Sequence, residues 1–83
     1  MVFFALTRTG YEEFARLLGI NQNLALWVNK DVLSDVELAS LRATGLSVTN
    51  FTTNIDFADS ASVDGALETI KEHHPHECVW LER

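Results

Sequence analysis

The sequence contains few of the residues that mark disulfide-rich, repetitive or unfolded chains. Its only cysteine, Cys78, cannot form an internal disulfide, which fits a reducing compartment. One proline and four glycines leave no low-complexity tract or linker. Hydrophobic residues make up 47% of the chain, a normal share for a folded domain. We therefore expect residues 1–83 to form a single small domain with a thin hydrophobic core.

Basic residues are also scarce, since six lysines and arginines stand against twelve acidic residues and give a net charge of −6. A surface of this sign repels phosphate backbones and anionic lipid headgroups, so we expect neither nucleic acid nor a membrane as partner. The apolar run "VFFAL" near the start is short and has no basic region ahead of it. It fits neither a signal peptide nor a membrane span, which predicts a cytoplasmic protein.

Short apolar segments recur along the chain and predict four strands. Residues 2–6 and 24–28 are continuously apolar, as in strands buried on both faces. Residues 46–53 mix polar with β-branched and aromatic side chains, which favours a strand at a sheet edge. Residues 78–82 form the fourth expected strand, with Cys78 at its buried start or just before it. If this strand is also an edge, a face of Trp80 becomes exposed and marks a partner surface.

Helical periodicity between these strands predicts three helices. The first two each show a capping-box pair and a closing glycine: Thr9 with Glu12 and Gly19, then Ser34 with Glu37 and Gly45. The third has an apolar face formed by Val63, Ala66, Leu67 and Ile70. Asp64 is expected in its first turn, where the helix dipole favours a negative charge. Pro75 disfavours helical geometry at the residue before it, so this helix should end near His73.

The resulting order, β-α-β-α-β-α-β, predicts an α/β domain with a mostly parallel four-stranded sheet and three helices. The two most apolar strands should be central and the polar third strand an edge. This favours strand order 3-2-1-4, with two helices on one face of the sheet and one on the other. A flavodoxin-like order, 2-1-3-4, and an antiparallel fourth strand remain alternatives.

All three histidines and the cysteine lie in "EHHPHEC", residues 72–78. His73 and His74 point about 100° apart on a helix, so they do not form the i, i+4 pair that suits a metal. Structural zinc sites usually draw ligands from two separated segments, and no second cluster exists. We therefore predict no metal or other cofactor, although adventitious binding by His73, His74 and His76 stays open. Cys78 follows a helix C-terminus rather than an N-terminus, which disfavours a catalytic thiol.

Polar residues follow the first three predicted strands, at the sheet edge where open α/β proteins bind ligands. These candidate ligand-binding residues are Thr7, Arg8, Thr9, Gly10, Asn29, Lys30, Thr53 and Asp56. A helix start that carries hydroxyls and an arginine can seat an anion, and Lys30 adds a second positive charge. The stretch "TRTG" nevertheless lacks both standard glycine-rich phosphate loops.

The residues suggest a non-catalytic domain that binds a protein partner or forms a homo-oligomer. A thin core and a polar edge strand favour assembly, since sheet edges are templates for pairing. The alternative is a small anion- or nucleotide-binding domain that uses Arg8 and Lys30. No nucleophile, base and orienting group occur in a pattern that indicates catalysis, so we predict no catalytic residues.

Overall fold

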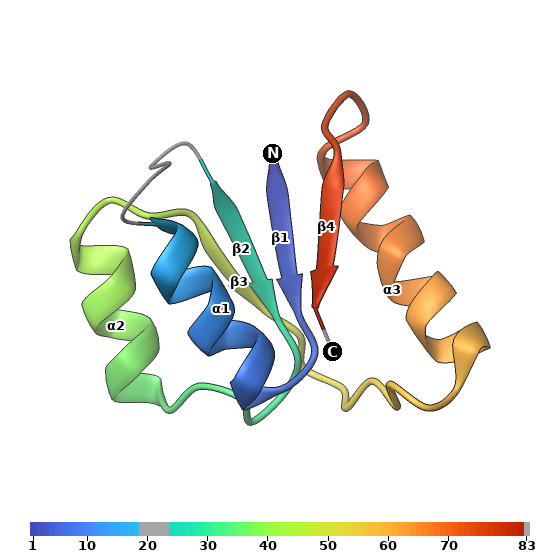
Figure 1. The fold of residues 1–83 in the computed structure, drawn as a ribbon, viewed down its shortest axis with the longest axis horizontal. Helices are drawn as coiled ribbons and strands as arrows, with labels where there is room; N and C mark the ends of the chain where they lie inside the picture. Colours follow the sequence, from blue (N-terminus) through green and yellow to red (C-terminus); the bar gives the residue numbers. More distant parts are fainter. Residues whose placement is uncertain (19–23, 83) are drawn as a thin grey trace.

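In the computed structural model, which describes residues 1–18 and 24–82, four strands alternate with three helices (Figure 1). The strands are β1 (Val2–Ala5), β2 (Ala25–Val28), β3 (Val48–Asn50) and β4 (Val79–Glu82). The helices are α1 (Arg8–Leu18), α2 (Asp35–Ala43) and α3 (Ser60–His73). Every neighbouring pair of strands is parallel, in the order β3-β2-β1-β4. The predicted order 3-2-1-4 is therefore confirmed, and neither alternative arrangement occurs.

The sheet separates two layers of helices (Figure 1). Alternate side chains of β1 point to opposite faces, so Phe3 and Ala5 join one hydrophobic cluster with α1 and α2. Val2 and Phe4 join a second cluster with α3, to which Trp27 of β2 also belongs. Two helices therefore cover one face of the sheet and one helix covers the other, as predicted. Both central strands are almost wholly buried, which is why they contain no charged residue.

The start of α2 is confirmed and that of α1 is corrected. Ser34 and Glu37 form the predicted capping box, with N–H···O distances of 3.2 and 3.1 Å. Helix α1, however, begins at Arg8, and the hydroxyl of Thr7 accepts the N–H of Gly10 at 3.2 Å. The predicted box at Thr9 is wrong because the chain turns into the helix directly after β1. The closing glycine expected at position 19 lies outside the described residues.

The start of α3 also differs from the prediction, whereas its end does not. Asp59 caps the helix by accepting the N–H of Ala61 at 3.1 Å. The first turn contains no acidic residue, so the placement of Asp64 there is wrong. The helix ends at His73 as predicted, with His74 as its C-cap.

The strand at each edge of the sheet is less buried than β1 and β2. Strand β3 is an edge, as predicted, but it is shorter than the polar segment 46–53 suggested. Strand β4 is the other edge and is only partly buried. Cys78 precedes β4 and is exposed, so the expectation of a buried cysteine at this strand is wrong. The cause is that β4 has a neighbouring strand on one side only.

The described chain is compact, with a radius of gyration of 11.9 Å. A folded domain of this length has a radius of gyration of about 12 Å. Among the helices described, none has the length and apolar character needed to cross a bilayer.

Candidate functional site

The parallel register brings the polar residues that follow β1, β2 and β3 to one edge of the sheet. The side chain of Asn29, directly after β2, links these segments and is only 4% exposed. Its amide nitrogen donates to the carbonyl oxygens of Leu6 at 3.2 Å and Ile55 at 2.8 Å. Its oxygen accepts the N–H groups of Ile55 and Lys30, both at 2.8 Å. Asn29 therefore has no capacity left for a ligand and instead braces the segments around it.

Arg8 is turned toward α2 and is engaged within the protein. Its guanidinium lies 2.7 Å from the carboxylate of Glu37 and 3.3 Å from the carbonyl oxygen of Val32. It also lies 5.1 Å from the centre of the Tyr11 ring, in cation–π geometry. The hydrogen bond to Glu37 raises the pKa of Arg8. The backbone N–H of Ser34 and then Arg8 hold the pKa of Glu37 below its usual range. Glu37 thus partly neutralises the positive charge of Arg8, which we predicted to bind an anion.

The start of α1 is packed against the end of β4. Gly10 is buried, and a Cβ atom at this position would lie 2.9 Å from the carbonyl oxygen of Glu82. The same oxygen accepts the N–H of Leu6 at 2.9 Å. A glycine is therefore required here by the close approach of two backbones, not by a phosphate. An acidic residue beside the helix start also opposes the binding of an anion.

The other sequence-predicted residues remain at the surface. Thr9, Lys30, Thr53 and Asp56 are exposed. The carboxylate of Asp56 accepts the N–H of Ala58 at 2.9 Å, as in an Asx turn. Thr53 borders an open groove of about 330 Å³ between α3 and the segment before it, whose lining residues are Phe51, Thr53, Asn54, Ile55, Ser62, Gly65, Ala66 and Thr69. This lining is neutral and contains no acid or base for catalysis.

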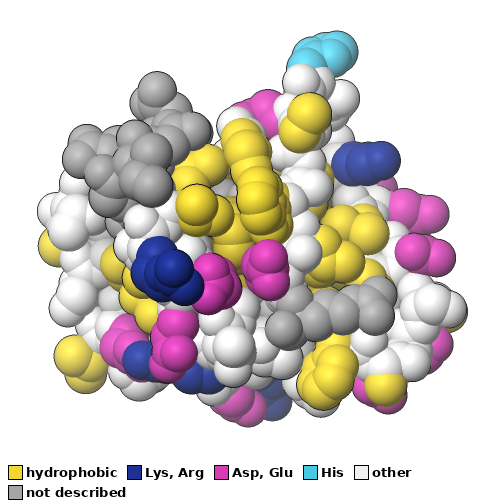
Figure 2. All heavy atoms as spheres, viewed as in Figure 1, with side chains coloured by type: hydrophobic (Ala, Val, Ile, Leu, Met, Phe, Trp, Pro, Cys, Tyr) yellow, Lys and Arg dark blue, Asp and Glu magenta, His cyan; other side chains and the backbone are white. Residues whose placement is uncertain are grey.

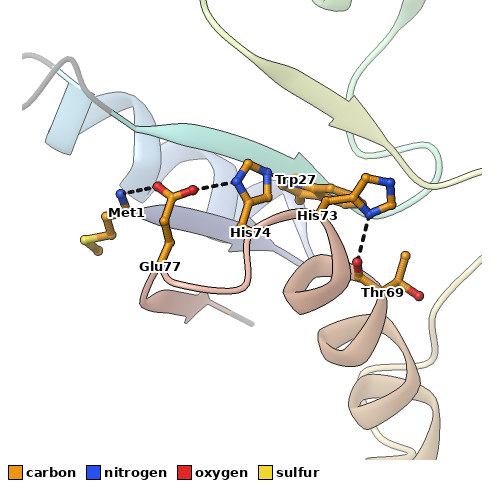
Figure 3. Close-up of polar contacts among 6 residues, drawn as sticks. All are labelled: Met1, Trp27, Thr69, His73, His74 and Glu77. Atoms are coloured by element: carbon orange, nitrogen blue, oxygen red, sulfur yellow. Dashed lines mark hydrogen bonds and ion pairs between the residues drawn. The ribbon is translucent and has the colours of Figure 1, made fainter.

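The histidines lie at the opposite edge of the sheet, as the alternating topology predicted. Nε2 of His74 accepts the indole N–H of Trp27 at 3.3 Å, and Nδ1 contacts the carboxylate of Glu77 at 2.5 Å (Figure 3). The other oxygen of that carboxylate accepts from the amine of Met1 at 2.9 Å. The Met1 amine and then His74 hold the pKa of Glu77 below its usual range. This chain of contacts ties the loop after α3 to β1 and β2.

The three imidazoles do not form a common site. Nδ1 of His73 contacts the carbonyl oxygen of Thr69 at 3.0 Å, on the preceding turn of α3. Both ring nitrogens of His74 are engaged by Trp27 and Glu77. Within residues 1–18 and 24–82, no three histidine, cysteine, aspartate or glutamate side chains gather in an arrangement that could hold a metal ion.

The remaining feature is an open surface on β4, which we call the Trp80 face. Trp80 is in register with Phe3, so both side chains point toward the α1 side of the sheet. The ring of Phe14 on α1 covers Phe3, with ring centroids 5.3 Å apart. Helix α1 approaches β4 closely at Gly10 and Glu82, and Trp80 keeps 45% of its surface exposed.

Charged side chains border the Trp80 face. The carboxylate of Glu82 accepts the indole N–H of Trp80 at 2.9 Å. On α1, Glu13 lies one turn after Gly10 and forms an ion pair with Arg16 at 2.9 Å. Figure 2 shows hydrophobic side chains gathered at the centre of the view, over β1 and β4, with basic and acidic side chains beside them. An apolar centre with a charged rim is typical of a protein-binding surface.

From the sequence we expected an exposed face of Trp80 if the last strand is an edge, and β4 is an edge. The sequence did not predict that Asn29 braces the segments around it. No signal in the local sequence identifies that role, because the partners of Asn29 come from three separate segments. Comparisons of the chain with protein families, curated proteins and solved structures found no match.

Proposed function

We propose that this chain is a non-catalytic protein-interaction domain that binds another polypeptide through β4 and the Trp80 face. The observation that carries the proposal is a tryptophan that keeps 45% of its surface exposed on β4, a strand at the edge of the described sheet. Large aromatic residues on such surfaces are common anchors of protein interfaces. The proposal includes a reducing, cytoplasmic location, which the single exposed cysteine supports.

The two edges of the sheet differ in how they are protected. At β3, the guanidinium of Arg42 donates to the carbonyl oxygen of Val48 at 3.1 and 3.4 Å. Strand β3 is also short and polar. Strand β4 has the sequence "VWLE", with no proline and with its only charge at the end. Exposed apolar edge strands pair with other chains unless they are protected, so β4 is the edge on which we expect a partner.

A photo-crosslinking amino acid, benzoylphenylalanine, placed at Trp80 tests this proposal. The matched control carries it at Glu68, which is exposed on α3 on the other side of the sheet. We expect the variant at position 80 to form a discrete covalent adduct with a polypeptide, either in pure solution, where the partner is a second copy of the chain, or in extract. An excess of unlabelled wild-type chain should suppress the adduct. An equal yield at position 68, or no adduct at position 80, would contradict the proposal.

The alternative function, anion or nucleotide binding by Arg8 and Lys30, has less support. Arg8 is paired with Glu37, and Glu82 lies beside the helix start. Lys30 is the exposed positive charge that favours this alternative. A titration with inorganic phosphate, followed by amide NMR shifts, decides the matter. Saturable shifts confined to residues 7–10, 29–31 and 52–56 would support this function over the first.

A further inference from the structure

We infer that the polypeptide that binds β4 is a second copy of this chain, joined by antiparallel pairing of the two β4 strands around Trp80. This inference rests on the proposed function and adds the identity of the partner and the register. It is carried by the main-chain hydrogen-bond pattern of β4, which is complementary to itself.

The main-chain groups of β4 divide into two sets. The carbonyl oxygens of Cys78 and Glu82 accept from β1 and the residue after it, at Val2 and Leu6, both at 2.9 Å. Because these groups alternate in direction along a strand, Val79 and Leu81 direct their N–H and C=O groups away from β1. In the described chain, β1 is the strand that pairs with β4, so the outward groups of Val79 and Leu81 face an open edge.

One register lets two such edges satisfy each other. Antiparallel pairing of Val79 with Leu81 of the partner subunit, and the reverse, forms two hydrogen-bonded pairs. Trp80 then lies opposite Trp80 of the partner subunit, on the two-fold axis. Directly opposed residues point to the same face, so the two Trp80 faces become continuous. This central pair is of the non-hydrogen-bonded type, in which side chains approach most closely.

Geometry favours this register over its two neighbours. It places Glu82 opposite Cys78 of the partner subunit, so no like charges face each other. The two neighbouring registers that keep the faces matched place Trp80 opposite either Glu82 or Cys78 of the partner subunit. Each of them leaves one hydrogen-bonded pair within the strand, at Leu81 or at Val79, instead of two. The contact is isologous and therefore closes as a dimer. Arg42 occupies the carbonyl oxygen of Val48 at the β3 edge, which disfavours pairing of a further strand there.

The position of Cys78 allows a chemical test of the outward N–H groups. Residues 78–83 can be made synthetically and joined to residues 1–77 at Cys78, the only cysteine, by native ligation. Methylation of the Leu81 amide nitrogen removes one outward donor and leaves the side chain intact. We expect the unmodified ligated chain to sediment as a dimer of 9.3 kDa subunits at high micromolar concentration. The methylated chain should associate at least tenfold more weakly, and equal association of the two would overturn the inference.

A disulfide trap tests the register. In a Cys78→Ser background, Trp80→Cys places two thiols opposite each other with Cα atoms about 4.5 Å apart, within the range that disulfides span. Val36→Cys is the control, since Val36 is 75% exposed on α2. We expect covalent dimers from the Trp80→Cys chain in glutathione buffer and none from the control. Equal dimer yields from the two variants would overturn the register.

The salt dependence of association is a further test of the dimer. Each chain carries a net charge of −6, so dimer formation should strengthen when NaCl rises from 50 to 500 mM.

The oligomeric state and the crosslinked partner together separate the failure of this inference from the failure of the proposed function. A chain that stays monomeric at millimolar concentration, but whose crosslinker at Trp80 captures a different polypeptide, overturns the second copy and leaves the proposed function in place. A monomer without any adduct overturns both.

Discussion

The indole N–H of Trp27, a residue 5% exposed in β2, donates to Nε2 of His74 at the end of α3. The bond spans 47 positions of the sequence and places a polar contact at the rim of the α3-side hydrophobic cluster. It also determines the tautomer of His74. Nε2 must be an acceptor, so the neutral ring carries its proton on Nδ1, which faces Glu77.

We expect ¹⁵N NMR at pH 8 to show the Nδ1–H tautomer of His74. His74→Ala should reduce the free energy of unfolding by about 1–2 kcal/mol, because the indole N–H of Trp27 loses its acceptor. His74→Gln keeps an acceptor in the side chain and should recover part of that loss. Denaturant unfolding measures both variants, and His76→Gln is the matched control, with little change expected. An Nε2–H tautomer at pH 8 would contradict the assignment.

Replacement of Asn29 should be among the most damaging single changes in the chain. Asn29→Ala removes four hydrogen bonds to main-chain groups in a buried position, so we expect a loss of about 2–4 kcal/mol. Asn29→Asp keeps the acceptor but directs a carboxylate oxygen at the carbonyls of Leu6 and Ile55. Urea unfolding should therefore show this variant to be closer to wild type at pH 4 than at pH 7. A constant difference between these pH values would count against the bracing role.

The two helical glycines Gly10 and Gly65 should respond to alanine in opposite ways. At Gly10 a Cβ meets the Glu82 backbone at 2.9 Å, so Gly10→Ala should destabilise the fold by about 1–3 kcal/mol despite better helix propensity. At Gly65 nothing lies within 4 Å of the added atom. Gly65→Ala should therefore stabilise α3 by up to about 1 kcal/mol. Thermal unfolding of the matched pair checks both signs, and destabilisation of similar size at both positions would refute the packing of α1 on β4.

Acid should weaken the fold through Glu37 and Glu77, whose pKa values are both lowered in the folded state. For a lowered pKa, the stabilisation is complete above the unfolded value, about 4.3, and is lost as pH falls through the folded value. Wild type should therefore lose stability relative to Glu37→Gln and Glu77→Gln as pH drops from 5 to 2. Urea midpoints across this range measure the effect. Glu68→Gln, an exposed change on α3, supplies the control curve.

The topology was predictable because burial leaves a direct mark on composition. Strands β1 and β2 are apolar at every position since helices cover both of their faces, and this pattern correctly placed them at the centre of the sheet. The stop at His73 was equally visible, because the effect of Pro75 on its neighbour is local. The start of α1 was not predictable from the sequence, since Thr7 and Thr9 can both cap a helix. The choice between them depends on where β1 ends against β4.

The sequence by itself determined the alternation of strands and helices, because this follows from local periodicity. The apolar character of the first two strands favoured the order 3-2-1-4, with "TRTG" and the histidines at opposite edges, but the choice between this order, the order 2-1-3-4 and an antiparallel fourth strand came from the tertiary structure. Only the tertiary structure decided how the side chains are used. In the folded protein Arg8 pairs with Glu37, and every hydrogen-bonding group of the Asn29 side chain has a main-chain partner. His74 accepts a hydrogen bond from Trp27, and Trp80 stays half exposed on β4. The physical reason is distance along the chain. Apart from the bond between Asn29 and its neighbour Lys30, each of these contacts joins residues more than twenty positions apart, and the exposure of Trp80 depends on which elements the fold places beside β4.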